Sequence, residues 1–137
     1  MSELLERGRR ILSQQSFSNW LGMELLRLSP DFAECALTLR DDMRQQHGIA
    51  HGGVVSALAD ATLAFAAGSI FEDVVTLEFK INFVRPARGA RLTARASVLH
   101  AGKRQAVVRC DVTCDSDDGE QLCALAQGTI SRKEVKP

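Results

Sequence analysis

Twenty consecutive residues, from Gly52 to Phe71, read GGVVSALADATLAFAAGSIF and carry a single charge, on Asp60. Their length and composition predict a long helix, and a helix that is apolar nearly all round must be enclosed by protein on most sides. A membrane-spanning helix is the alternative, but a carboxylate at its centre costs about 3 kcal/mol for insertion. Amphipathic segments further along the chain offer a better partner for burial. We therefore expect a core helix and no membrane partner.

The segments that follow this helix are predicted to be strands. In residues 75–83, five apolar residues alternate strictly with polar ones, which predicts that these five share one buried face of an antiparallel strand. The same alternation recurs in three later segments, separated by turn residues. These segments span residues 92–98, 106–114 and 122–126.

The segments before the helix complete the expected architecture. Residues 2–16 have weak helical spacing, with Ser2 as a candidate N-cap. Two short apolar runs, 23–28 and 32–39, flank a Ser-Pro-Asp turn and predict a hairpin. A run of strands on each side of one helix is typical of an α+β protein with an antiparallel sheet. We expect that sheet to curve around the central helix.

Length and composition limit the classes of protein to be considered. The chain has 137 residues, the usual size of one compact domain, so we expect a single domain over residues 1–137. Its 45% of hydrophobic residues argues against intrinsic disorder. Because it has 17 basic and 17 acidic residues, no overall charge attracts it to nucleic acid. We expect no nucleic-acid partner.

The four cysteines indicate free thiols rather than a metal site or disulfides. The first ten residues lack the apolar core of a secretory signal, which favours a reducing, cytoplasmic location. Cys110 and Cys114 are four positions apart in a predicted strand, which is not the spacing of a CxxC motif. We expect no metal ion.

Asp60 is the residue that most needs an explanation, because proteins rarely bury a carboxylate without a partner or a task. It could be a structural group bonded to a nearby turn, or a functional one. Just upstream, a helix that begins near Gly52 has backbone N–H groups without internal partners, which can polarise a carbonyl oxygen. Gly52 and Gly53 could allow a ligand to approach this backbone, or merely permit a tight entry into the helix.

The distance between these two features constrains their use. Asp60 lies eight residues after Gly52, so the two are about 12 Å apart along the helix axis. They cannot both contact one reacting carbonyl from the same chain. If they cooperate, Asp60 of one subunit must face Gly52 of another about a twofold axis. The sequence thus predicts a homodimer with two composite sites.

The motif His51-Gly52-Gly53-x6-Asp60, followed by FVRPARG at residues 83–89, resembles the hotdog-fold acyl-CoA thioesterases of the phenylacetate-pathway, PaaI-like type. The resemblance implies a curved antiparallel sheet around a central helix, and a dimer with a continuous sheet. It further implies a homotetramer formed by two such dimers. The implied reaction is hydrolysis of an acyl-CoA thioester without a metal or separate cofactor, since coenzyme A is part of the substrate.

The resemblance also implies roles for individual residues. Asp60 takes the carboxylate role, as general base or nucleophile, and the Gly52 N–H polarises the thioester carbonyl on the partner subunit. Thr76 falls where some members have a hydroxyl that orients the water or the carboxylate. Gln45 stands where members commonly have asparagine, so its amide is expected to bind water or thioester through a side chain longer by one methylene.

Four further residues are expected to bind substrate. His51 is expected to shape its loop and contact the thioester, and Gly53 to let the ligand approach. Arg85 and Arg88 lie near one turn and could bind the coenzyme A phosphates, or simply belong to a charged loop. A non-catalytic acyl-CoA-binding module is the alternative function. A hotdog hydratase or dehydratase is disfavoured, because their proline-rich histidine loop is absent.

Overall fold

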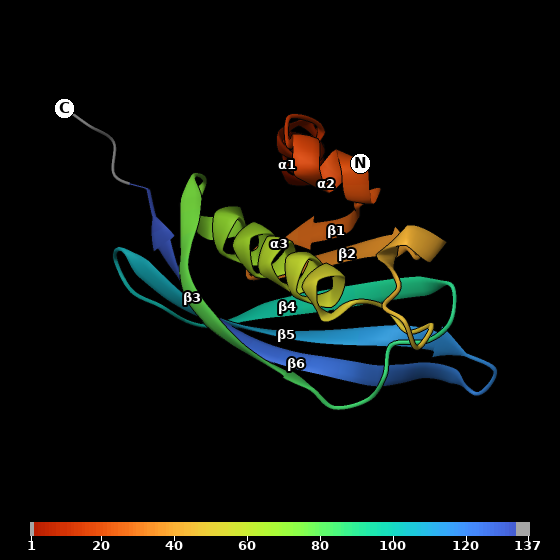
Figure 1. Ribbon diagram of the computed structural model, residues 1–137. Helices are drawn as coiled ribbons and strands as arrows, with labels where there is room; N and C mark the ends of the chain where they lie inside the picture. The colour runs from red at the N-terminus through yellow and green to blue at the C-terminus, as the bar shows by residue number, and fades with distance from the viewer. Residues whose placement is uncertain (1, 134–137) are drawn as a thin grey trace.

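The computed structural model describes residues 2–133, which form a curved six-stranded antiparallel sheet around one long helix (Figure 1). The strands lie in the order β1-β2-β4-β5-β6-β3. The predicted α+β architecture, with the sheet curved around a central helix, is confirmed. In chain order the elements are α1 (Glu3–Ser13), α2 (Ser16–Leu21), β1 (Glu24–Ser29), β2 (Phe32–Thr38), the 3-10 helix η1 (Asp41–Met43), α3 (Gly52–Phe71), β3 (Val74–Phe83), β4 (Arg91–Ala101), β5 (Gln105–Ser116) and β6 (Gly119–Arg132).

The central helix α3 presents one face to the concave side of the sheet. Leu58, Leu63 and Ala66 are fully buried there. By length and composition alone α3 could cross a membrane, yet half of its most apolar stretch is buried inside the protein. The opposite face, including Ala57 and Ala61, is only half-buried. Gly53 is the one exposed residue of α3, so the helix is largely enclosed, as predicted, although its outer face is less deeply buried than the face toward the sheet.

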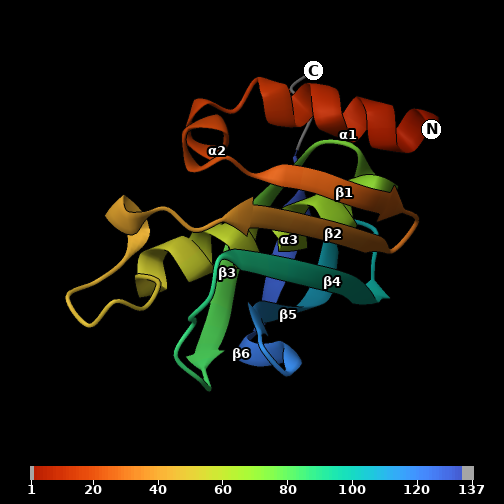
Figure 2. The same cartoon turned by 90° about the vertical axis from the view of Figure 1, so that its right-hand side faces the viewer.

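Two helices, rather than one, precede the sheet. The predicted N-cap of α1 is confirmed, because Ser2 Oγ accepts a hydrogen bond of 3.1 Å from Leu5 N–H. A short second helix, α2, follows and is capped by Gly22, whose φ of +77° is the left-handed conformation that favours glycine. Figure 2 shows α1 lying outside the sheet, alongside β1.

The edge strand β3 departs from the predicted strict alternation because it contains a β-bulge. Its pairing with β6 shifts register between Thr76 and Glu78, which leaves Leu77 as the extra residue. Phe79, after the bulge, packs against the core as predicted. Val75 and Leu77, predicted on the same face, are instead 51% and 52% exposed. The bulge thus divides the predicted apolar face and turns Thr76 toward α3.

Candidate active site

One half of the site joins the middle of α3 to β3. Thr76 Oγ1 donates a hydrogen bond of 2.8 Å to Asp60 Oδ1, and both residues are half-buried. Among the described residues, no donor binds the second carboxylate oxygen of Asp60. A carboxylate that is fixed through one oxygen and free at the other can accept a proton or attack a carbon atom.

The other half of the site is the N-terminus of α3. His51 is the N-cap, and its Nδ1 accepts a hydrogen bond of 2.8 Å from Gly53 N–H. Because Nδ1 is an acceptor, the neutral imidazole carries its proton on Nε2, at an exposed side chain. Within residues 2–133, Gly52 N–H donates to no acceptor. The tip of the helix therefore has one free backbone donor, the N–H of Gly52, because the N–H of Gly53 is already bound by His51.

The loop before α3 is fixed by backbone hydrogen bonds. His51 N–H donates to Met43 O at 2.8 Å, and Ala50 N–H donates to Ala87 O at 2.9 Å. Gln45 Oε1 accepts a hydrogen bond of 2.6 Å from His47 N–H. Since the amide oxygen of Gln45 is used inside the loop, its NH₂ group is the part that is left to bind a ligand.

A surface hollow of about 360 Å³ brings several of the predicted residues together. Gln45, Gly52 and Arg85 all line it, so the loop, the helix tip and the segment after β3 meet there. Asp60 and Thr76 do not line this hollow. Within one chain the Asp60–Thr76 pair and the helix tip are therefore separate from each other, as their spacing along α3 requires.

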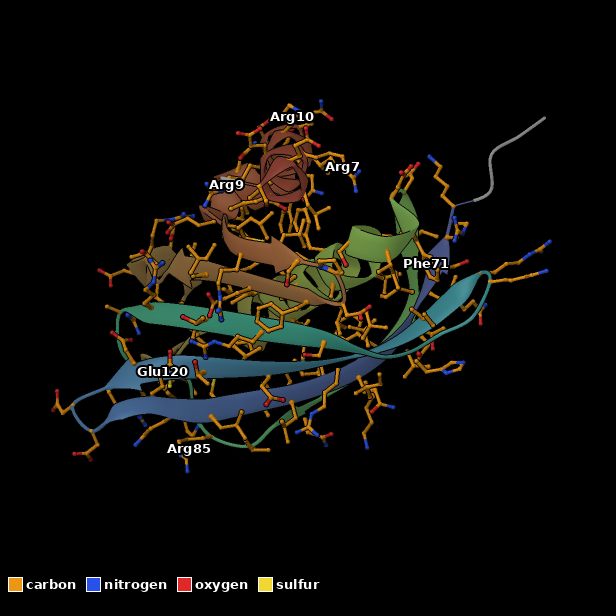
Figure 3. The ribbon with its side chains drawn as sticks, turned by 180° about the vertical axis from the view of Figure 1, so that it is seen from behind. Arg7, Arg9, Arg10, Phe71, Arg85 and Glu120 are labelled. Atoms are coloured by element: carbon orange, nitrogen blue, oxygen red, sulfur yellow. The ribbon has the colours of Figure 1, made fainter. Side chains whose placement is uncertain are left out.

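The two predicted arginines occupy different positions. Arg85 Nη1 donates a hydrogen bond of 2.8 Å to Leu122 O, which fixes the guanidinium at the hollow. Figure 3 shows Arg85 beside β6, at the end of the molecule away from Phe71. Arg88 is exposed in the same connecting segment but does not line the hollow. The geometry thus groups Arg85, and not Arg88, with the helix tip.

Phe83 and Cys123 are among the residues of the hollow that could not be assigned to a site from the sequence. Phe83 was predicted in the core but is 55% exposed, and a Cβ at Gly52 would lie 3.3 Å from its Cζ. Cys123 comes from β6, and no local pattern connects it to α3. Burial raises the pKa of Cys123 to about 12, so its thiol stays protonated near neutral pH and is a poor nucleophile.

Comparison with known proteins identifies relatives of this chain. Residues 47–120 match the model of the thioesterase superfamily. The medium/long-chain acyl-CoA thioesterase YigI of Escherichia coli K12 is 31% identical over 123 residues, covering 77% of this chain and 79% of YigI. A thioesterase family protein from Silicibacter pomeroyi superposes with a TM-score of 0.90 and 30% identity, over 93% of this chain and 96% of that one. The PaaI protein of the E. coli phenylacetic acid degradation operon superposes with a TM-score of 0.86 and 26% identity, over 96% of this chain and 97% of the PaaI chain.

Proposed function

Because the chain belongs to the thioesterase superfamily and is a thioester hydrolase, we propose that it hydrolyses acyl-CoA thioesters, with aryl or short- to medium-chain acyl groups, to a free acid and coenzyme A. The observation that carries this proposal is the carboxylate of Asp60, fixed by Thr76 and free at one oxygen. The named activity of the relative YigI supports coenzyme A as the leaving group. The proposed reaction uses no metal ion and no cofactor apart from the coenzyme A of the substrate.

The proposed active form is a homodimer, because the two half-sites lie about 12 Å apart on one helix. β3 is the last strand in the sheet order, so one of its edges has no partner strand within the chain. The exposed side chains of Val75 and Leu77 belong to this strand. A long apolar edge strand is a ready surface for pairing with another chain. Pairing of two β3 edges about a twofold axis would bring Asp60 toward Gly52 of the partner subunit, and two such dimers would form a tetramer.

In the proposed mechanism, Asp60 removes a proton from a water molecule as the water oxygen attacks the thioester carbon. The carbonyl oxygen becomes negatively charged and is bound by the backbone N–H of Gly52 of the partner subunit. The C–S bond then breaks, and the coenzyme A thiolate takes up the proton. Direct attack by Asp60 would instead form an anhydride that water opens. Label in Asp60 after a single turnover in ¹⁸O-water would show direct attack, with water opening the anhydride at the Asp60 carbonyl.

Gln45 and Arg85 of the hollow are assigned to substrate binding, together with His51, Gly53 and Arg88, which do not line it. The NH₂ group of Gln45 is placed to donate to the thioester or to water, since its oxygen is held by the loop. The Nε2–H of His51 is a second donor, and Gly53 leaves room for the ligand. Arg85 is positioned to bind a phosphate of coenzyme A, with Arg88 as an outer contact, because guanidinium groups bind phosphate through paired hydrogen bonds.

The proposed function is tested with a panel of acyl-CoA thioesters and a reagent that traps free thiols. We expect release of free coenzyme A from at least one acyl class, with turnover that depends on Asp60. Binding of acyl-CoA without thiol release would favour the alternative, a non-catalytic acyl-CoA-binding module. Modification of the acyl chain without thiol release would favour a hydratase.

Replacing Leu77 by lysine is expected to convert the dimer to a monomer and to lower kcat/KM by at least about tenfold, because a charge on an edge strand opposes strand pairing. The matched control is Leu99→Lys, since Leu99 is similarly exposed, at 55%, but lies on the interior strand β4. Light scattering coupled to gel filtration gives the mass, and thiol release gives the activity. A fully active dimer of the Leu77 variant would contradict the proposed interface.

A further inference from the structure

A groove of about 520 Å³ runs between α1 and the side of α3 that the sheet does not cover. It is separate from the hollow at the helix tip, because the two share no lining residue. Its apolar lining includes Ile11, Leu28, Ala61, Ala64, Phe65 and Val74, with Gly68 between them. Its volume is typical of a small-molecule site.

The wall formed by α1 is held closely against β1. A Cβ at Gly8 would lie 2.6 Å from Leu25 Cδ2 and 2.8 Å from Leu28 Cδ2, so a larger residue here would have to displace these leucine side chains. Arg9 Nε also donates a hydrogen bond of 3.0 Å to Leu25 O. The width of the groove is therefore set by the packing of α1 on the sheet.

The floor of the groove begins beside the candidate catalytic carboxylate. Ala61 follows Asp60 directly, and Ala64 lies one helical turn further along the same face. Gly68 continues this row by another turn, so three positions without long side chains form a trough. Asp60 does not itself line the groove, but a ligand bound at Asp60 would have this row of small residues beside it, leading away from the helix tip.

We propose that this groove binds the acyl chain of the substrate, and that it selects a straight chain of about eight to ten carbons. The inference rests on the proposed acyl-CoA thioesterase function. From Asp60 to Gly68 the helix rises about 12 Å. A fully extended chain advances about 1.2 Å per bond, so about ten bonds fit this length.

The far end of the groove explains why the chain length is limited. Arg7, Glu72 and Asp73 line the groove there, and they replace the apolar contacts with charged groups. Figure 3 shows Arg7 projecting from α1 on the side where Phe71 ends α3. Carbon atoms beyond Gly68 would meet charge and water, so they would add little to binding.

The first test measures kcat/KM for a series of saturated acyl-CoA thioesters from butyryl to palmitoyl. For the wild-type protein we expect kcat/KM to rise by up to about fourfold with each added methylene. This rise should end near ten carbons. Gly68→Leu should fold, because a Cβ at Gly68 meets only Val74 Cγ2, at 3.9 Å, and glycine is unfavourable inside a helix. The leucine should lower kcat/KM for decanoyl-CoA by about tenfold or more, through loss of two or more buried methylenes, and leave butyryl-CoA unchanged.

A second pair of variants tests the wall formed by α1. Ile11→Trp places a large ring at a lining position, whereas Arg10→Trp places the same ring at the adjacent, exposed position that does not line the groove. We expect the first variant to lose activity on decanoyl-CoA and keep it on butyryl-CoA. The second should match the wild-type chain on both substrates.

The groove assignment and the proposed function can fail separately. If Gly68→Leu and Ile11→Trp keep the wild-type chain-length profile, or reduce all chain lengths equally, the groove does not bind the acyl chain although the function stands. If the wild-type chain releases no coenzyme A from any thioester, the function fails and calorimetric binding of decanoyl-CoA becomes the readout. Weaker binding to Gly68→Leu would then support the groove, and equal binding to both proteins would overturn it.

Discussion

Replacing Asp60 by asparagine is expected to lower kcat/KM for acyl-CoA by about 10²- to 10⁴-fold, the usual contribution of a positioned base. Asparagine keeps the shape of the side chain and an oxygen that can accept the hydrogen bond from Thr76 Oγ1. It cannot accept a proton near neutral pH, and it is a poor nucleophile. Since Asp60 is half-buried, removing its charge should not lower the thermal stability or disrupt the dimer. Thiol release, thermal unfolding and gel filtration measure the three quantities.

The matched control is Asp111→Asn, which removes a carboxylate on β5 that pairs with Arg109 at 3.3 Å, away from both half-sites. Its activity should equal that of the wild-type chain. A folded Asp60→Asn dimer with near-normal turnover would remove Asp60 from the mechanism. It would then leave the carboxylate as a structural partner of Thr76.

Replacing Gly52 by proline is expected to reduce kcat by about 10²- to 10³-fold, the cost of losing one oxyanion donor. The substitution removes the free N–H and suits the local backbone. Proline is favoured at the first position of a helix. His51, the preceding residue, has φ −61° and ψ 137°, in the region preferred before proline. The helix should therefore form, and circular dichroism checks that it does.

The control for this variant is Gly52→Ala, which adds a Cβ but keeps the N–H. The added carbon would contact the Phe83 ring at 3.3 Å, and that side chain is exposed enough to move. We expect kcat of the alanine variant to fall by less than about tenfold, because the N–H that binds the oxyanion remains. Equal losses in the proline and alanine variants would mean that crowding near Phe83, rather than the missing N–H, causes the defect.

Mixing the two inactive variants tests whether the sites are shared between subunits. A dimer of one Asp60→Asn chain and one Gly52→Pro chain has one site with an intact Asp60 and an intact Gly52. Random exchange makes half of the dimers mixed, each with one complete site of two, so about a quarter of wild-type activity should return. No recovery after demonstrated subunit exchange would contradict the composite site.

Most of the fold could be predicted because it follows from local patterns. The apolar run from Gly52 to Phe71 has too little charge for a surface helix, and period-two alternation marks the strands around it. The bulge in β3 could not be predicted in this way. Val75 and Leu77 have the same local pattern as Phe79, and only the pairing of β3 with β6 shifts them to the other face. The shallower burial of the outer face of α3 could not be predicted, because the composition of a helix does not show how far a sheet extends around it.

The candidate site could be predicted in part for the same reason. Asp60 and Gly52 stand out locally, as a charge in an apolar helix and as a free helix tip. The prediction of Thr76 depended on the family resemblance, because the contact of Thr76 with Asp60 requires the bulge. Cys123 reaches the hollow, and Ile11 the groove, from distant parts of the chain. Contacts of this kind arise from tertiary packing and leave no periodic signal in the sequence.

The one-residue bulge in β3 adds an apolar side chain to the outer surface of the sheet. A variant lacking Leu77 would restore a regular ladder, because the residues on either side of it already pair with consecutive residues of β6. Thr76 would still face α3 and keep its hydrogen bond to Asp60, whereas the outer surface would lose one apolar side chain. A deletion at this single position should therefore weaken assembly and preserve the geometry of the carboxylate, whereas deletions in the turn between β5 and β6 should affect neither.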